Sequence, residues 1–98
     1  MSDSKEFSWA WVTASQALSH VPCELVSVVL VATGATTDST VYNGTTAEGA
    51  VVFKLVANAA ITRPVRFPVP IYCPNGLYVE VGSNVAGILV QWRASSYD

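Results

Sequence analysis

Short runs in which apolar and polar side chains alternate, separated by turn residues, dominate this sequence. In residues 63–73 the apolar side chains of one face occupy every second position: Val65, Phe67, Val69 and Ile71. A period of two is the side-chain period of a β-strand. About seven or eight such runs occur, and roughly 8–12 residues separate successive turn signals, which is typical of a β-sandwich. The pattern therefore predicts an all-β chain that forms one small β-sandwich, and we favour the jelly-roll type.

Individual strands are predicted from the same alternation. Residues 24–33 are apolar on both faces, which indicates a central strand buried on both sides. Residues 63–73 carry three prolines on the face opposite Val65, so we expect an edge strand or an extended wrapping segment. Residues 14–19 fit either one helical turn or a short strand. The remaining predicted strands are 7–13, 40–43, 51–57, 77–81 and 88–93.

The chain length and the N-terminal sequence indicate a single domain. Ninety-eight residues are the length of one domain, and no linker or repeat divides them. We therefore expect one sandwich domain over residues 1–98, with residues 1–6 as a flexible or extended N-terminal arm. The N-terminus lacks the basic and apolar regions of a signal peptide, which predicts a chain that folds in the cytoplasm where it is made.

Charge and hydropathy exclude two classes of partner. The net charge is −2, and the five basic residues are scattered, whereas nucleic-acid binders concentrate positive charge. The longest apolar stretch, residues 25–32, contains a serine and is far shorter than the roughly 20 residues of a membrane-spanning helix. We therefore expect neither a nucleic acid nor a membrane as partner.

Candidate catalytic and metal-binding residues are few. His20 is the only histidine, no serine lies in a nucleophile motif, and no phosphate-binding loop is present. Cys23 and Cys73 are too few for a zinc site. In a reducing compartment we expect them to be free thiols buried as small apolar side chains, although a single bridge between them stays open. The sequence therefore predicts a protein that is not an enzyme and that uses no metal or cofactor.

The aromatic residues near the N-terminus are the candidate site. Phe7, Trp9 and Trp11 alternate with small residues and so share one face of a strand. Three interpretations are open. The rings could pack into the domain's own core, they could form a subunit or capsid interface, where tryptophan is enriched, or they could form a platform on which a sugar stacks. Trp92, in a strongly alternating strand, is interpreted as a core residue.

A family resemblance rests on two segments. Residues 39–52, STVYNGTTAEGAVV, and residues 75–79, NGLYV, resemble a hairpin and a later segment of small structural proteins of tailed bacteriophages. The resemblance covers roughly residues 25–93. It implies a jelly-roll or immunoglobulin-like sandwich that decorates a capsid or builds tail and fibre parts.

From this resemblance we expect a virion structural protein made in the host cytoplasm. Our first choice is a capsid decoration or cement protein that binds the major capsid protein and stabilises the shell as a homo-oligomer, with a trimer favoured. The alternatives are a tail, fibre or adaptor component of the virion, with other virion proteins as partners, and a small carbohydrate-binding module. An outward, coplanar pair of Trp9 and Trp11 beside a groove would favour sugar binding, whereas burial of both rings between subunits, with no groove, would favour cement.

Overall fold

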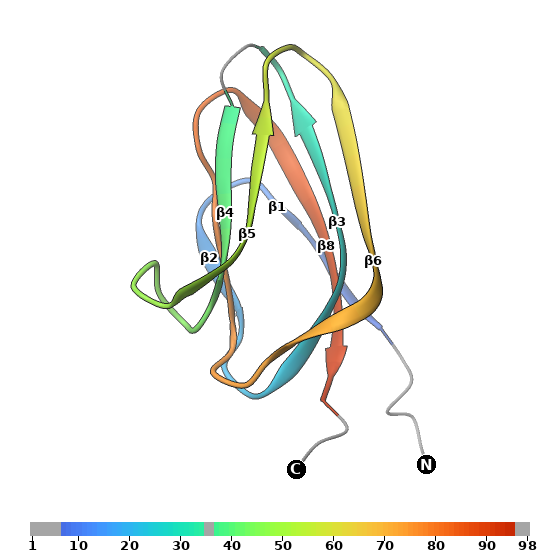
Figure 1. The fold of residues 1–98 in the computed structure, drawn as a ribbon. Coiled ribbons are helices and arrows are strands. Elements are labelled where there is room, and N and C mark those ends of the chain that lie inside the picture. Colours follow the sequence, from blue (N-terminus) through green and yellow to red (C-terminus); the bar gives the residue numbers. More distant parts are fainter. Residues whose placement is uncertain (1–6, 35–36, 96–98) are drawn as a thin grey trace.

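A computed structural model describes residues 7–34 and 37–95, so the predicted arm at residues 1–6 lies outside the described residues. The described residues form strands and turns without a helix (Figure 1). The eight strands are β1 (Ser8–Val12), β2 (Gln16–Ser19), β3 (Cys23–Ala32), β4 (Thr37–Asn43), β5 (Ala50–Ala57), β6 (Thr62–Cys73), β7 (Leu77–Glu80) and β8 (Val85–Ala94).

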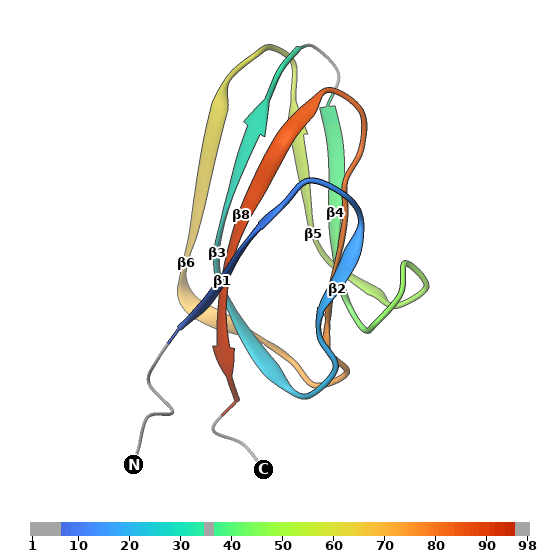
Figure 2. The same cartoon turned by 180° about the vertical axis from the view of Figure 1, so that it is seen from behind.

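The strands form two four-stranded antiparallel sheets that pack face to face (Figures 1 and 2). Sheet A has the order β1-β8-β3-β6, and sheet B has the order β2-β7-β4-β5. The pairs are nested along the chain: β4 pairs with β5, β3 with β6, β2 with β7 and β1 with β8. Successive pairs alternate between the two sheets, which is the topology of a jelly roll. The predicted fold class, a single small β-sandwich of jelly-roll type, is confirmed.

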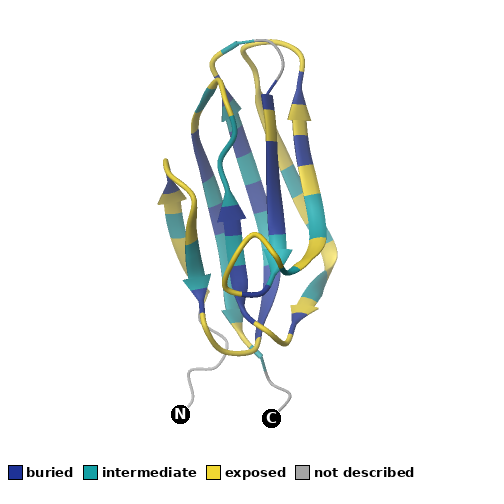
Figure 3. Cartoon of the chain, turned by 90° about the vertical axis from the view of Figure 1, so that its left-hand side faces the viewer, coloured by how far each residue is buried: buried dark blue, intermediate teal, exposed yellow. Residues whose placement is uncertain are grey.

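The core lies between the sheets and receives every second side chain of most strands (Figure 3). In β8, Ile88 and Val90 are fully buried, and Trp92 packs against the core from the same face, as predicted. In β3 the inward residues are fully buried as well, among them Val28 and Leu30. Burial of an aliphatic side chain of this size contributes about 1.5–3 kcal/mol, so this shared interior is the main stabilising element.

Strand β3 is central, as predicted, because it lies between β8 and β6. Its two faces differ, however. Residues of the inward face are buried, whereas Val29 and Val31 on the outward face are only half-buried. The prediction that β3 is buried on both sides is therefore wrong for most of its outward residues. No second layer of the described chain covers the outer face of sheet A.

Strand β6 is an edge strand of sheet A, as its prolines predicted. Its ladder with β3 is interrupted, because Arg66 lies opposite Ser27 whereas Ile71 lies opposite Leu25. Residues 67–70 have no partner in that ladder. The interruption breaks the period of two, and Val69 is 77% exposed instead of lying on the inward face with its neighbours. The predicted common face of residues 65–71 is wrong at this position.

Phe67 closes one side of the sandwich. Its ring meets the ring of Phe53 on β5 edge to face, with the centroids 5.4 Å apart. Such pairs contribute about 0.5–1.5 kcal/mol beyond the area they bury. Since β5 is the edge of sheet B and β6 the edge of sheet A, this contact joins the two sheets along one side.

The two segments that carry the family resemblance meet in space. The backbone N–H of Asn75 donates to Oδ1 of Asn43 at 2.9 Å, and that of Gly44 donates to the carbonyl oxygen of Gly76 at 3.3 Å. Gly76 has a positive φ of 113°, and a Cβ there would lie 2.6 Å from the carbonyl oxygen of Ser19. The Asn-Gly sequences thus fit two turns that dock on each other, which is a structural role.

Strand β2 decides between two alternatives that the sequence left open, and strand β4 begins earlier than predicted. Residues 16–19 form strand β2 and not a helical turn, and the hydroxyl of Ser15 accepts a hydrogen bond from the N–H of Val81 at 2.9 Å. Strand β4 begins at Thr37, three residues before the predicted start. The side chain of Thr37 is buried and donates to the carbonyl oxygen of Asn84 at 3.1 Å, which holds the start of β4 against the turn before β8.

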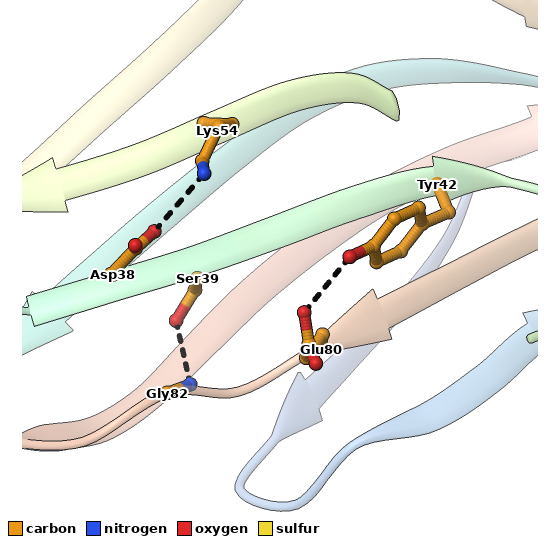
Figure 4. Close-up of polar contacts among 6 residues, drawn as sticks. All are labelled: Asp38, Ser39, Tyr42, Lys54, Glu80 and Gly82. Atoms are coloured by element: carbon orange, nitrogen blue, oxygen red, sulfur yellow. Dashed lines mark hydrogen bonds and ion pairs between the residues drawn. The ribbon is translucent and has the colours of Figure 1, made fainter. Parts of the chain in front are cut away.

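Polar contacts between β4 and its neighbours are shown in Figure 4. Tyr42 donates to Glu80 at 2.9 Å, and this contact with a carboxylate raises the pKa of Tyr42. The exposed pair of Lys54 and Asp38, at 3.9 Å, contributes little, as is usual for surface ion pairs. The N–H of Gly82 donates to the buried hydroxyl of Ser39 at 3.1 Å. The segment that follows β7 therefore passes directly against β4.

Gly82 is predicted to be essential for this close approach. A Cβ at Gly82 would overlap the carbonyl oxygen of Asp38, which is backbone and cannot move aside cheaply. We expect Gly82→Ala to lower the free energy of unfolding by about 1–3 kcal/mol, as overpacking usually does. The matched control is Gly34→Ala, where the nearest atom to a new Cβ is a side-chain carbon of Asn84 at 3.8 Å. Urea unfolding of both variants measures the difference, and equal effects would contradict the explanation.

Candidate binding surface

The outer face of sheet A carries the three candidate aromatic residues. Phe7, Trp9 and Trp11 point outward and are 52%, 68% and 47% exposed. Ala10, between the two tryptophans, packs against the core, and Val12, after Trp11, is fully buried in it. The interpretation in which the three rings pack into the domain's own core is therefore wrong. The small residues of β1 supply its core face, and the large ones stay accessible.

Trp11 is held against the backbone of β8. A Cβ at Gly87 would overlap three atoms of the Trp11 indole, so the ring occupies the space that the missing side chain leaves. Gly87 is itself buried. The next ring along β1, Trp9, lies opposite Gln91 of β8 and is the most exposed of the three. The surface therefore combines one anchored ring with one accessible ring.

Phe7 is positioned by a charged pair at the other end of the same face. The guanidinium carbon of Arg93 lies 5.9 Å from the centroid of the Phe7 ring, within the range of a cation–π contact. The Nε of Arg93 also donates to Oε1 of Glu24 at 2.7 Å, directly across the β3–β8 ladder. Glu24 is only 6% exposed, so this pair neutralises a buried carboxylate. The charge of both groups is thereby largely cancelled at the surface.

A shallow groove of about 410 Å³ lies on this face beside Phe7. Strands β3, β6 and β8 provide the rest of its lining: Val26, Ser27, Val29, Pro64, Val65, Arg66 and Gln91. Ser27 donates to the side-chain oxygen of Gln91 at 2.7 Å, which leaves the NH₂ group of that amide without a partner among the described residues. The groove therefore has apolar walls and a few polar donors, the composition typical of small-molecule sites.

The sequence identified the aromatic residues of this surface but missed the groove. Ser27 was visible as the one polar residue in an apolar run, and Gln91 as an outward residue of its strand. Their contact depends on the pairing of β3 with β8, however, and a single strand pattern does not contain that register. Nothing in the sequence around Gly87 indicated that this glycine provides the space for the Trp11 ring.

The other candidate residues do not gather into a site. His20 is exposed in the turn between β2 and β3. Within residues 7–34 and 37–95, no three side chains of His, Cys, Asp or Glu lie together in a way that could hold a metal ion. No helix in this part of the chain is long and apolar enough to cross a membrane. Cys23 and Cys73 are both free and buried, and they lie directly opposite each other on β3 and β6.

Comparison with protein-family models, with curated proteins and with solved structures finds no match for this chain. The class of the protein is therefore defined by its topology, a small jelly-roll β-sandwich. The resemblance to phage structural proteins stays a prediction from the sequence.

The packing of Trp11 on Gly87 can be tested directly. We expect Gly87→Ala to displace the indole, to shift tryptophan fluorescence to longer wavelength and to lower the free energy of unfolding by about 1–3 kcal/mol. In a Trp11→Ala background the same glycine substitution should cost much less, because the clashing ring is gone. A double-mutant cycle measures this coupling. Additive effects of the two substitutions would contradict the contact.

Proposed function

We propose that this protein is a structural component of a tailed-bacteriophage virion and that it binds its partners through the outer face of sheet A. The favoured role is that of a capsid decoration or cement protein, which binds the major capsid protein and stabilises the shell. The observation that carries the proposal is the outward row of Phe7, Trp9 and Trp11, of which the two tryptophans lie on the edge strand β1 and Phe7 directly precedes it. The sequence resemblance to phage structural proteins adds the virion setting.

Exposed aromatic side chains on one sheet face are typical of protein interfaces. Clustered apolar patches on a surface mark interaction sites, and tryptophan is enriched among the residues that dominate binding free energy. Trp11 is already fixed against Gly87, so less conformational entropy is lost when it is covered. The pairing of Arg93 with Glu24 also keeps unpaired charge away from this end of the surface, which lowers the cost of desolvation.

The edge of sheet A adds a second way to bind. Strand β1 is hydrogen-bonded to β8 on one side only, so alternate N–H and C=O groups on its other side point away from the sheet. Residues 8–12 contain no charge and no proline. Such an edge can accept a strand from another chain by β-augmentation. In this proposal β1 is the receiving edge of a formed sheet, and the binding strand comes from a capsid protein or a second copy.

Capsid binding is the decisive experiment for this proposal. We expect the purified protein to form a closed homo-oligomer, with a trimer favoured, in light scattering. It should also cosediment saturably with capsids of the phage that encodes it. Trp9→Ala should weaken cosedimentation by about 30-fold, the effect of losing roughly 2 kcal/mol at a dominant interface residue.

The matched control is Val51→Ala. Val51 is 58% exposed on β5, in the other sheet, and should have no effect on binding. A monomer that does not bind capsids would contradict the decoration role. Equal loss with both variants would contradict the assignment of the surface.

A carbohydrate-binding module is the second candidate, and the groove favours it. Trp9 and Trp11 are outward, which is one part of the arrangement expected for sugar binding. Neither ring lines the groove beside Phe7, which offers donors from Gln91 and Arg66. Jelly rolls occur in lectins as well as in capsids, so the fold fits both functions.

Glycan binding separates the two candidates. If the module function holds, neutral oligosaccharides such as maltohexaose, cellohexaose or chitohexaose should quench tryptophan fluorescence with a saturable titration. Trp9→Ala and Gln91→Ala should each abolish the quenching, while Val51→Ala should not. A surface built only for protein contact should give no quenching with any of these sugars, and Gln91→Ala should leave capsid binding nearly unchanged.

A further inference from the structure

Cys23 and Cys73 form a directly opposed pair at one end of sheet A. Cys23 is the first residue of β3, Cys73 is the last residue of β6, and the two face each other in the antiparallel ladder. The next two pairs along this ladder, Glu24 with Tyr72 and Leu25 with Ile71, follow without a shift. The local register is therefore regular at the two cysteines.

The geometry of such a pair suits a disulfide. Opposed residues of an antiparallel ladder have Cα atoms about 4.5–5.5 Å apart, which lies inside the roughly 4.4–6.8 Å range of disulfides. Opposed side chains also point to the same face of the sheet. Here that face is the core, because Cys23 is 1% exposed and Cys73 is fully buried. The position of the two residues in the ladder therefore matches the backbone spacing of a disulfide.

The two thiols also influence each other's acidity. A hydrogen bond with the Cys73 thiol lowers the pKa of Cys23, and the same contact together with burial raises the pKa of Cys73. Cys23 is therefore the residue that ionises first. The thiolate is the nucleophile in thiol–disulfide exchange, so whichever cysteine ionises once the pair is exposed attacks the oxidant.

Access to the pair is possible through a small local opening. The ladder between β3 and β6 is interrupted at residues 67–70, so residues 71–73 form a short separate segment at the end of an edge strand. Segments of this kind open at a lower free-energy cost than the whole domain. Separation of this segment from β3 would expose the two sulfur atoms while residues 62–66 stay paired with β3.

We propose that Cys23 and Cys73 are an oxidisable pair that forms an intrachain cross-strand disulfide when the folded protein meets a disulfide oxidant such as glutathione disulfide. The thiolate of one cysteine attacks one sulfur of the oxidant, forming a mixed disulfide and releasing one glutathione thiolate. The other cysteine then loses its proton to solvent, and its sulfur attacks the sulfur of the first and releases the second glutathione. The two thiols lose two electrons and two protons in total, and one glutathione disulfide becomes two glutathione molecules.

The bond would tie the end of the edge strand to the centre of sheet A. It would fix residues 71–73 beside Glu24, whose partner Arg93 contacts the Phe7 ring. A crosslink between residues far apart in sequence also restricts the unfolded chain. We therefore expect the oxidised protein to unfold at a temperature roughly 10 °C or more above that of the reduced protein. This inference does not depend on the proposed virion function.

Redox titration of the purified, folded chain tests the proposal. The protein is equilibrated at pH 8 with glutathione buffers of increasing oxidising strength, then denatured with an excess of iodoacetamide and weighed by intact mass spectrometry. We expect an unalkylated monomer that is lighter than the fully reduced chain by two hydrogen atoms, and a peptide in which Cys23 is joined to Cys73. Dithiothreitol should reverse both the mass change and the rise in unfolding temperature.

Cys23→Ser and Cys73→Ser are the controls. Each should show neither the intrachain crosslink nor the rise in unfolding temperature. Comparison of the reduced and oxidised wild-type chain needs no substitution, so the test holds even if a variant folds poorly. Two free thiols at the most oxidising buffer would overturn the proposal, as would crosslinking that occurs only in urea or an oxidised form that unfolds at a lower temperature.

Discussion

Burial of the two inner sheet faces against each other holds this sandwich together, and the pairing of the first strand with the last depends on it. Five residues of β1 lie opposite residues 88–92 of β8, and both strands send their inward residues into the common core. Each strand pair encloses the pair before it, from the local β4–β5 hairpin out to β1–β8. The outer pairs therefore close long loops, whose entropic cost is offset only when the two sheets bury their inner faces together. The outward position of the β1 aromatics is a consequence of this closure.

Much of the fold follows from the alternation of side chains. The alternation predicted most strands and the inward face of β8. The three prolines of β6 predicted its edge position. The alternation did not predict which strands pair or in what register, because those contacts join residues far apart in the chain. Val69 shows a second limit. The alternation in the sequence continues through residues 67–70, although the ladder is interrupted there and the burial pattern breaks, so the exposed position of Val69 depends on a feature that the local sequence does not contain.

The candidate surface was predictable only in part for a similar reason. Alternation placed Phe7, Trp9 and Trp11 on one face, but both faces of that strand are apolar enough to be the core face. Which face of the strand becomes the core face is decided by the residues that each face contacts in the folded protein. The interior has room for Ala10 and Val12, whereas Gly87 on the outer face provides the space that the Trp11 indole occupies. The groove needs three strands in register, so its donors could not be assembled from the sequence.

The four sheet edges differ in how well they are protected against unwanted pairing. Strand β6 carries three prolines and an interrupted ladder, β5 carries the charged Lys54, and β2 is only four residues long. These are devices by which natural sheets avoid joining edge to edge. Strand β1 is also short, at five residues, but it has no charge, proline or ladder interruption, and it carries the exposed rings of Trp9 and Trp11. In the proposed assembly, another chain would therefore pair with the β1 edge, because pairing at the other three edges is disfavoured. The choice of edge would then depend on the features that block the other three as much as on favourable contacts at β1.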